Sequence, residues 1–316
     1  MNILNAIAEG SFGKVFRAED CKTGRIFAVK QFIENPTLEC EQLRREYAML
    51  KACQHSNILK CHKLVQAATD SPNAGHCYLV LDYYPLDLRQ FLLNQKPRSP
   101  TVLQSMTRQI LQAVDYLHTQ HRIVHTDIKP GNFLVSEDAT AAATATTPPS
   151  VILCDFSSAL VTGSEAHKMA RGHEYGTLWY RAPENFLGVD SRTNYIFGTP
   201  MDMWAVGCVL FELVTNKPLL VAHSDHEQFL LICTLFGTPS VQNWPDVKFR
   251  RKYTQLQKMP NYVNRSSVII KRSLASSGAP REFIDLVLRL LVLDPVQRLT
   301  STEALAHPFV KLAIYP

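Results

Sequence analysis

The 316-residue sequence has few features of a secreted or membrane protein. None of its eight cysteines forms a C-x-x-C pair, and their spacing is not that of a disulfide-rich secreted domain, so we expect reduced thiols. No apolar run approaches the roughly 18 residues of a membrane span. The first residues enter patterned sequence directly, which leaves no room for a signal peptide. We therefore expect a cytoplasmic or nuclear protein with no membrane partner.

Charge is also scarce, at 19% of residues and a formal net charge of +5. The densest basic run, K-F-R-R-K at 248–252, is typical of a solvated loop; a nuclear-import or acidic-partner role is the less favoured alternative. We expect no nucleic-acid partner. The hydrophobic content of 46% is enough to bury a large core, in one domain or in two closely joined lobes.

Three polar side chains are concentrated in one short loop between apolar segments. Within residues 123–135, apolar pairs flank a loop that holds Asp127, Lys129 and Asn132, which predicts two short buried strands around it. These residue types suit phosphoryl transfer. A carboxylate can accept the proton of an attacking hydroxyl, an ammonium can neutralise the moving phosphoryl group, and an amide oxygen can bind Mg²⁺.

The loop reads H-T-D-I-K-P-G-N and resembles the catalytic loop of eukaryotic protein kinases, H-R-D-x-K-x-x-N, with Thr126 in place of the arginine. A chance loop with exposed charges is the alternative for this octet alone. A second motif follows an apolar strand at 151–154, which delivers Asp155, a carboxylate suited to Mg²⁺. This D-F-S resembles the kinase D-F-G, with Ser157 in place of glycine.

Later motifs extend the resemblance over essentially the whole chain. They are G-T-L-W-Y-R-A-P-E at 176–184, D-M-W-A-V-G at 202–207 and A-H-P-F at 306–309. Arg298 is placed to pair with Glu184. The resemblance implies the α+β bilobal protein kinase fold, with a β-rich N-lobe that carries one long helix and a mainly helical C-lobe.

The expected divisions follow from that resemblance: N-lobe 1–83, C-lobe 84–316, a low-complexity insert at 136–150 and an activation segment at 155–184. Sequence patterns agree, with turn-separated strands within 3–33, a helix over 38–53 and an amphipathic helix over 101–119. The insert lacks large apolar groups and is expected to be a mobile loop.

The N-terminal glycine-bearing turn is by itself best explained as an ordinary hairpin, because Ala8 stands at the first glycine of G-x-G-x-x-G. Joined to the strand that ends in Lys30, it resembles the kinase clamp in which backbone N–H groups cover ATP phosphates. Leu81 would be the gatekeeper, backbone groups of Asp82 and Tyr84 would bind adenine, and Asp87 would lie near the ribose. The full implied ATP-binding set is Ile7, Ala8, Glu9, Gly10, Gly13, Val15, Ala28, Lys30, Leu81, Asp82, Tyr84, Asp87 and Leu134.

The resemblance also implies catalytic roles. Lys30 would orient the ATP phosphates while Glu46 holds it; the alternative for Glu46 is a surface helix pair. Asn132 and Asp155 would hold Mg²⁺. Asp127 would orient and deprotonate the substrate hydroxyl, Lys129 would neutralise the transferred group, and Thr177 would bridge Asp127 and Lys129. For His125 a packed position is favoured over proton transfer.

Lys129 matches the serine/threonine-kinase pattern, and the C-lobe motifs resemble the cyclin-dependent kinases of the CMGC group. The 38–53 helix carries E-Q-L-R-R-E at 41–46 rather than a PSTAIRE-type sequence. This difference counts against a cyclin partner, and a cyclin or another activator that binds this helix is kept only as an alternative.

The activation segment departs from the family in a consistent way. The activating phosphothreonine falls on Gly172, and two of the three arginine positions that would hold its phosphate are Thr126 and Leu160, with only Arg45 retained. This predicts a kinase that does not depend on activation-loop threonine phosphorylation, because an arginine pocket without phosphate would be costly to bury.

Substrate preference is expected to follow from Gly176 and Arg181. A glycine adopts positive φ without steric cost, so its carbonyl can turn toward Arg181, an arrangement that in the family selects Ser/Thr-Pro substrates. The alternative is a nucleotide-binding pseudokinase or scaffold, suggested by Ala8, Thr126 and Ser157. None of these three changes removes a phosphate or metal ligand. The A-P-E and D-x-W motifs argue against a small-molecule kinase.

Overall fold

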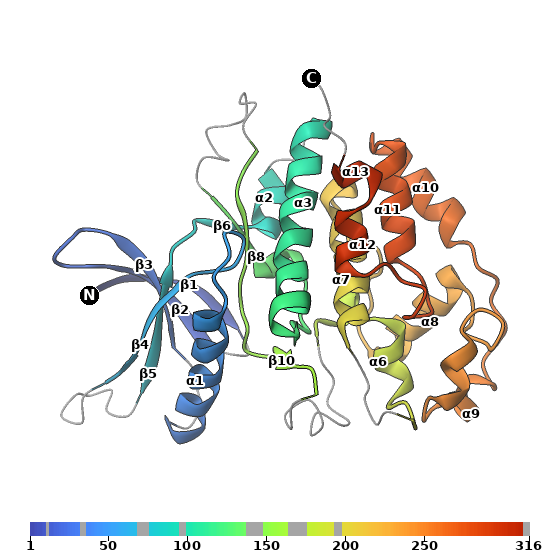
Figure 1. The fold of residues 1–316 in the computed structure, drawn as a ribbon, viewed down its shortest axis with the longest axis horizontal. Coiled ribbons are helices and arrows are strands. Elements are labelled where there is room, and N and C mark those ends of the chain that lie inside the picture. Colours follow the sequence, from blue (N-terminus) through green and yellow to red (C-terminus); the bar gives the residue numbers. More distant parts are fainter. Residues whose placement is uncertain are drawn as a thin grey trace.

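A sheet and one helix form one end of the molecule, and a helical body forms the other (Figure 1). The computed structural model describes residues 1–10, 13–31, 36–67, 76–94, 99–136, 148–163, 176–192 and 198–311. The sheet is antiparallel with strand order β1-β2-β3-β5-β4. Its strands are β1 (Asn2–Gly10), β2 (Gly13–Glu19), β3 (Ile26–Gln31), β4 (Cys61–Gln66) and β5 (Cys77–Asp82).

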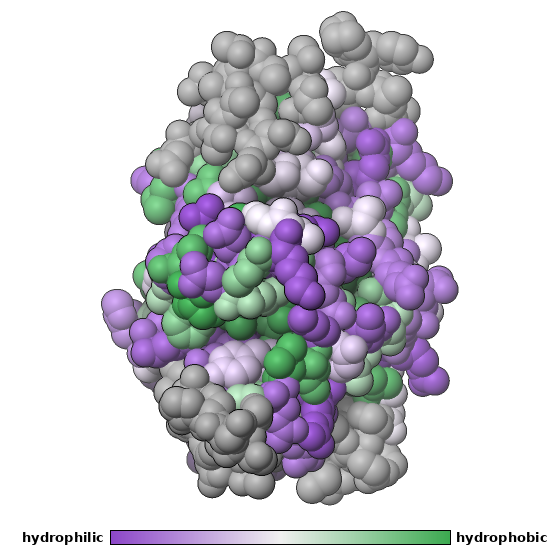
Figure 2. Space-filling view, turned by 90° about the vertical axis from the view of Figure 1, so that its left-hand side faces the viewer, coloured by the Kyte–Doolittle hydropathy of each residue, from purple (hydrophilic) through white to green (hydrophobic). Residues whose placement is uncertain are grey.

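Burial rises toward the centre of this sheet. Four consecutive residues of β3 are buried, whereas β1 at the edge is exposed along its length. Figure 2 shows this end of the molecule, with hydrophobic residues interspersed among hydrophilic ones. Helix α1 (Pro36–Ala52) packs on β4 and β5 and buries Leu43 and Leu50. The predicted helix over 38–53 is therefore present, and its inner face closes the core beneath the sheet.

The helical body is built around α7 (Thr199–Thr215), in which every residue from Met201 to Leu213 is buried. A helix that is apolar on all sides is stable only inside a core. Gly207 allows α7 to approach its neighbour closely, because a Cβ there would lie 2.8 Å from Leu291. Helix α3 (Pro100–Tyr116) packs on α7 and continues as a π-helical turn, Leu117–His121, so the end of the amphipathic helix predicted over 101–119 is π-helical. The other helices are α2 (Leu88–Asn94), α6 (Pro183–Leu187), α8 (Asp225–Phe236), α9 (Tyr253–Leu256), α10 (Ser266–Ser276), α11 (Arg281–Leu290), α12 (Ser301–Leu305) and α13 (Pro308–Lys311).

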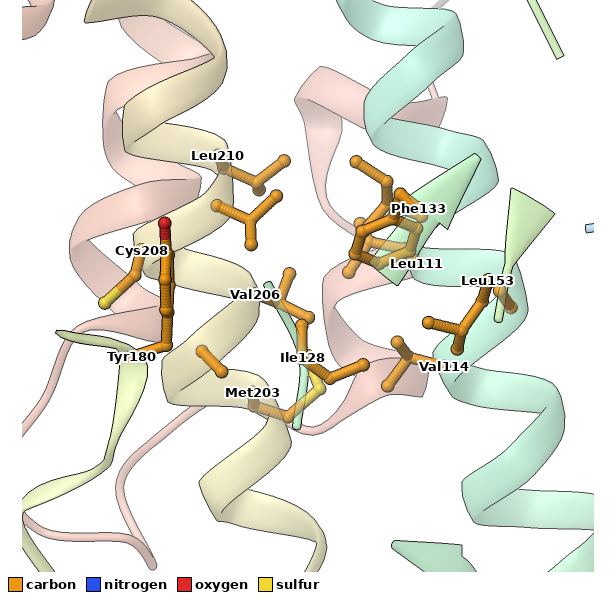
Figure 3. Close-up of a cluster of buried hydrophobic side chains, with 14 of the residues drawn as sticks. Leu111, Val114, Ile128, Phe133, Leu153, Tyr180, Met203, Val206, Cys208 and Leu210 are labelled. Atoms are coloured by element: carbon orange, nitrogen blue, oxygen red, sulfur yellow. The ribbon is translucent and has the colours of Figure 1, made fainter. Parts of the chain in front are cut away.

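Two small sheets hold the polar loop between the two ends. Strand β7 (Ile123–Val124) pairs with β10 (Leu160–Val161), and β8 (Phe133–Val135) pairs with β6 (Leu86–Asp87) and β9 (Val151–Leu153). The predicted strands flanking the loop are thus β7 and β8. Phe133 of β8, Leu153 of β9 and Ile128 of the loop enter the core beside α3 and α7 (Figure 3).

Two expectations need comment. The prediction that all eight cysteines are reduced is wrong for Cys77, which is disulfide-bonded. The physical reason is that spacing along a chain does not reveal which thiols meet in space. The other thiols the structure describes are free: Cys21, Cys53, Cys61, Cys154, Cys208 and Cys233. Most of the predicted insert, residues 137–147, lies outside the described residues.

Among the described residues, no helix combines the length and the hydrophobicity that crossing a membrane would require.

Candidate active site

A buried ion cluster joins the sheet to the segment after β9. Lys30, on β3, places Nζ 2.8 Å from Glu46 Oε1 and 2.8 Å from Asp155 Oδ1. Lys30 is only 7% exposed and Glu46 only 2%. The surface-pair alternative for Glu46 is therefore wrong, because its side chain points from α1 into the core beneath the sheet. Three residues far apart in the chain meet at one ammonium.

The electrostatics of this cluster keep Lys30 charged. Burial alone would lower the pKa of Lys30, but the carboxylates of Glu46 and Asp155 outweigh it and raise that pKa. Burial likewise works against ionisation of Asp155, yet the Lys30 ammonium and two hydrogen bonds hold the pKa of Asp155 below its usual range. For Glu46 burial dominates and raises the pKa, although Lys30 opposes it. The cluster thus offers an ammonium and an ionised carboxylate at neutral pH.

A second polar cluster is built by the loop between β7 and β8. Asp127 is 6% exposed, and its Oδ2 accepts from Lys129 Nζ at 2.7 Å. Its Oδ1 accepts from the backbone N–H of Thr177 at 2.7 Å and from the Thr177 hydroxyl at 2.8 Å. Lys129 Nζ also donates to Thr177 Oγ1 at 2.8 Å. Thr177 therefore bridges Asp127 and Lys129, as predicted, through three hydrogen bonds of its own.

Asn132 completes this cluster from the other end of the loop. Its side-chain nitrogen donates to the backbone carbonyl of Asp127 at 2.8 Å and to Asp127 Oδ2 at 3.1 Å. Because the nitrogen is used in this way, the amide oxygen is the atom left to act as a ligand. The Asn132 carbonyl accepts from the Cys154 N–H at 2.9 Å, which brings the residue before Asp155 alongside.

Burial disfavours ionisation of Asp127, but the charge and hydrogen bonds of Lys129 and Thr177 outweigh it and lower the pKa of Asp127. This side chain is a carboxylate at any physiological pH. Such a group is a weak base that can hold a hydroxyl in place and accept its proton as a new bond forms at oxygen.

One carboxylate from the buried helix α7 holds the loop itself. Asp202, 1% exposed, accepts from the backbone N–H groups of His125 at 2.8 Å and Thr126 at 2.9 Å, and it also lies 2.9 Å from His118 Nε2. His125 Nε2 lies 3.0 Å from the Cys154 carbonyl, and its ring meets Phe156 edge-on at 5.3 Å. His125 therefore packs the loop against the strand that carries Asp155, in agreement with the favoured interpretation.

Two hydroxyl contacts were missed at the sequence level. Ser157 Oγ donates to Asp155 Oδ1 at 2.8 Å, so the residue in place of the motif glycine adds a donor to that carboxylate. Thr126 Oγ1 lies 3.0 Å from the Ser158 carbonyl oxygen and 2.9 Å from Ser158 Oγ. The departures from the motif glycine and arginine drew attention to Ser157 and Thr126, but the spacing of residues in the sequence did not reveal their hydrogen-bond partners.

The far end of the activation segment meets the same loop through Gly176. This residue has φ +84°, and its carbonyl accepts from Arg181 Nε at 2.7 Å, as expected. Arg181 Nη1 also donates to Asp225 Oδ1 at 2.8 Å. A Cβ at Gly176 would lie 2.6 Å from the Thr126 carbonyl oxygen, so only glycine fits both the backbone angle and the space.

The predicted nucleotide-contacting residues come from several strands. Val15 pairs with Ala8 and with Lys30, and Ala28 pairs with Leu81, which is buried. The described residues other than glycine with positive φ do not include Ala8, so its side chain causes no backbone strain. The remaining members are placed as follows: Ile7, Glu9 and Gly10 on β1, Gly13 on β2, Leu134 on β8, Asp82 at the end of β5, and Tyr84 between β5 and β6.

Asp87 has a structural use that the sequence did not suggest. Its Oδ1 accepts from the Gln90 N–H at 2.7 Å at the start of α2. Burial raises the pKa of Asp87, although these backbone donors oppose the shift. Side-chain contacts of Asp82 are also structural, with Oδ1 2.8 Å from both Arg25 Nη2 and His62 Nε2.

Cys154 and Glu184 are two further buried residues near the site. Cys154 is buried, and burial raises its pKa far above the ordinary value, so its thiol is a packed group rather than a nucleophile. Glu184 lies 2.8 Å from Arg298 Nη1, and both side chains are almost fully buried. That pair ties the A-P-E motif to the C-terminal part of the chain, as predicted.

The family model of the protein kinase domain matches residues 1–310. The chain belongs to the protein kinase family. It therefore has the bilobal α+β kinase fold and is a phosphotransferase of a family that uses ATP and usually Mg²⁺. The donor set fits such a group, since Asp155 supplies an ionised carboxylate and Asn132 an amide oxygen, both of which are ligands that Mg²⁺ accepts.

Proposed function

We propose that this kinase transfers the γ-phosphoryl group of MgATP to serine or threonine hydroxyls of proteins, as a member of the cyclin-dependent-kinase type. The observation that carries the proposal is that the side chains within each polar cluster are already in contact in the structure of the chain alone. Lys30 contacts Glu46 and Asp155 at 2.8 Å, and Asp127 contacts Lys129 and Thr177 at 2.7–2.8 Å. This arrangement supports the proposal, because in-line phosphoryl transfer needs an ammonium at the phosphates, oxygen ligands for the metal and a carboxylate at the attacking hydroxyl.

The roles of the residues follow from these positions. Lys30 would bind the α- and β-phosphates, and Asp155 and Asn132 would hold Mg²⁺, which when bound supplies positive charge. Asp127 orients the substrate hydroxyl and accepts its proton late. Lys129 neutralises the transferred group. Backbone groups of Asp82 and Tyr84 would hold the adenine, and the β1–β2 hairpin would cover the phosphates.

We also propose that the substrates are Ser/Thr-Pro sites. The Gly176 carbonyl is directed at Arg181 Nε, 2.7 Å away, and so is not offered to a substrate N–H. A residue that follows the phosphorylated hydroxyl would leave its N–H unpaired there, at a cost of about 1–3 kcal/mol. Proline has no N–H and avoids that cost. The site would therefore select proline because any other residue at that position leaves a backbone N–H without a hydrogen-bond partner.

Activity is proposed to be independent of activation-loop threonine phosphorylation. Thr126 and Leu160 occupy two arginine positions of the family's phosphate pocket, and both are buried in neutral contacts. Gly172, at the phosphothreonine position, lies outside the described residues. The closed Lys30–Glu46 pair further supports activity without a cyclin or another activator bound to α1.

The test is a phosphotransfer assay with the purified chain, MgATP and a degenerate Ser/Thr peptide library, before and after phosphatase treatment, with Asp127→Asn as the inactive control. We expect transfer that survives phosphatase and enriches proline after the phosphorylated residue. The competing function is a nucleotide-binding pseudokinase. ATP binding without transfer above the Asp127→Asn background would favour that alternative and overturn the proposal, and transfer without proline enrichment would overturn only the substrate assignment.

A further inference from the structure

The start of the activation segment is attached to the catalytic loop by neutral groups. Strand β10 pairs with β7, and the Thr162 N–H donates to the Arg122 carbonyl at 2.8 Å. Between this pairing and Asp155 lies Ser158, whose carbonyl and hydroxyl oxygens are 3.0 and 2.9 Å from Thr126 Oγ1. Thr126 is 4% exposed, so water does not compete for these contacts.

The protons of this pair can be assigned. A threonine hydroxyl has one proton, and the Ser158 carbonyl can only accept, so the Thr126 hydroxyl donates to that carbonyl. The Ser158 hydroxyl is then the donor across the 2.9 Å separation, into a lone pair of Thr126 Oγ1. Both hydroxyls and the carbonyl are satisfied, and no charge is needed.

Thr126 is fixed on its other sides as well. Its N–H donates to Asp202 Oδ1 at 2.9 Å, and its carbonyl lies against Gly176 at the far end of the activation segment. Its φ is +70°, which is unfavourable for a β-branched residue and persists only when the surroundings determine it. Thr126, the residue directly before Asp127, therefore contacts both ends of the activation segment.

We propose that Thr126 is a positioning residue whose hydroxyl pair with Ser158 holds the start of the activation segment, and with it Asp155, against the catalytic loop. The pair does with two neutral hydrogen bonds what an arginine and a phosphate would do with charge. The inference rests on the proposed function for its kinetic consequence, but its structural consequence stands apart. Loss of the hydroxyl would loosen residues 157–162 whether or not the chain transfers phosphate.

The decisive variant is Thr126→Val, which keeps the β-branch, and so the backbone strain, while it removes only the hydroxyl. Thr126→Ser keeps the hydroxyl and serves as the conservative rescue. Thr107→Val is the matched control, because Thr107 is also buried and its hydroxyl donates to the Leu103 carbonyl at 2.8 Å, within α3. Ser158→Ala tests the pair from the other side and carries the test if Thr126→Val does not fold.

Amide hydrogen exchange of residues 157–162 is the first measurement. Ser158→Ala loses one hydrogen bond of the pair and should raise exchange there by about 5- to 30-fold, and Thr126→Val loses both and should raise it at least as much. Thr126→Ser and Thr107→Val should stay within about twofold of wild type in this segment. Unchanged exchange in both Thr126→Val and Ser158→Ala would overturn the inference.

Kinetics provide the second measurement. A positioning role predicts that kcat of Thr126→Val falls by about 5- to 30-fold while the KM for ATP stays within about twofold, because the Lys30 site is intact. Recovery in Thr126→Ser is expected. A fall in kcat that Thr107→Val reproduces would show a general loss of stability and overturn the inference. If wild type transfers no phosphate, the proposed function fails, and hydrogen exchange still decides this proposal.

Discussion

Gly176→Ala should damage catalysis more than stability, and the structure provides the control that separates the two effects. Gly176 has φ +84°, and an added Cβ would meet the Thr126 carbonyl oxygen at 2.6 Å. Gly278, after α10, has φ +86° with nothing within 4 Å of an added Cβ. The two substitutions thus share the backbone penalty, and only Gly176→Ala adds the clash.

The backbone penalty of an L-residue at such a φ is about 1–2 kcal/mol. With an unfolding entropy of roughly 2.1 cal/mol/K per residue, that penalty corresponds to a fall in Tm of about 1.5–3 °C for a chain of 316 residues. Both variants should show at least this loss. Ordinary contact at Gly176 requires that the Thr126 carbonyl move by about 0.8 Å, and Asp127 is the next residue. A misplacement of about 1 Å at reacting groups can cost roughly 100-fold in rate, so we expect kcat for Gly176→Ala to fall by about 10- to 100-fold.

Calorimetry and steady-state phosphotransfer to a Ser/Thr-Pro peptide measure the two effects. We expect Gly278→Ala to retain the wild-type kcat within about twofold despite its lower Tm. If Gly176→Ala keeps wild-type kcat, or if Gly278→Ala loses as much, then the contact between Gly176 and the Thr126 carbonyl does not position Asp127.

Three further expectations concern the same site. Arg181→Lys should weaken the proposed preference for proline by about 5- to 10-fold, because a lysine has no fixed fork with which to contact the Gly176 carbonyl and Asp225 together. A degenerate peptide library would measure this preference, and an unchanged enrichment of proline would contradict the expectation. Mass spectrometry after brief treatment with iodoacetamide should find Cys21 modified well before Cys154, since Cys21 is exposed and burial raises the pKa of Cys154; early modification of Cys154 would show that the thiol is reactive. Because Lys30 lowers the pKa of Asp155 against its burial, this carboxylate stabilises the fold above its unfolded pKa of 3.8 and loses that contribution as pH falls through the folded pKa. The stability deficit of Asp155→Asn in urea unfolding should thus be constant at pH 5–7 and shrink below about pH 4, and a deficit independent of pH would contradict the assignment.

Residues that lie on regular patterns could be placed from the sequence. The apolar pairs around the polar loop predicted β7 and β8, and the resemblance to kinases placed Lys30, Glu46 and Asp155 at one point. The strands could be predicted because hydrophobic periodicity depends only on neighbouring residues. The contacts between distant residues could be predicted only because the family motifs carry that information, which periodicity does not.

What could not be predicted depends on short-range geometry between segments distant in the chain. The contact of Thr126 with Ser158 depends on a left-handed backbone angle at a β-branched residue, which local preference disfavours. The donation of Ser157 to Asp155 depends on a side-chain rotamer, and the disulfide of Cys77 on proximity in space. At Thr126 and Ser157 the chain departs from the usual residue of the motif, so the motif indicates the position but not the new partner.

Asp202 belongs to α7, which is buried from Met201 to Leu213, and this position limits how the catalytic loop can move. The catalytic loop cannot shift without disturbing the interior of the C-terminal body, since its backbone N–H groups end on a carboxylate that α7 holds. We therefore expect any opening of the site to occur on the sheet side, where Lys30 and Glu46 stand on separate elements, β3 and α1. Molecules that alter the rate of this kinase without touching its nucleotide pocket should accordingly act on α1 and the sheet, and leave the loop geometry as it is.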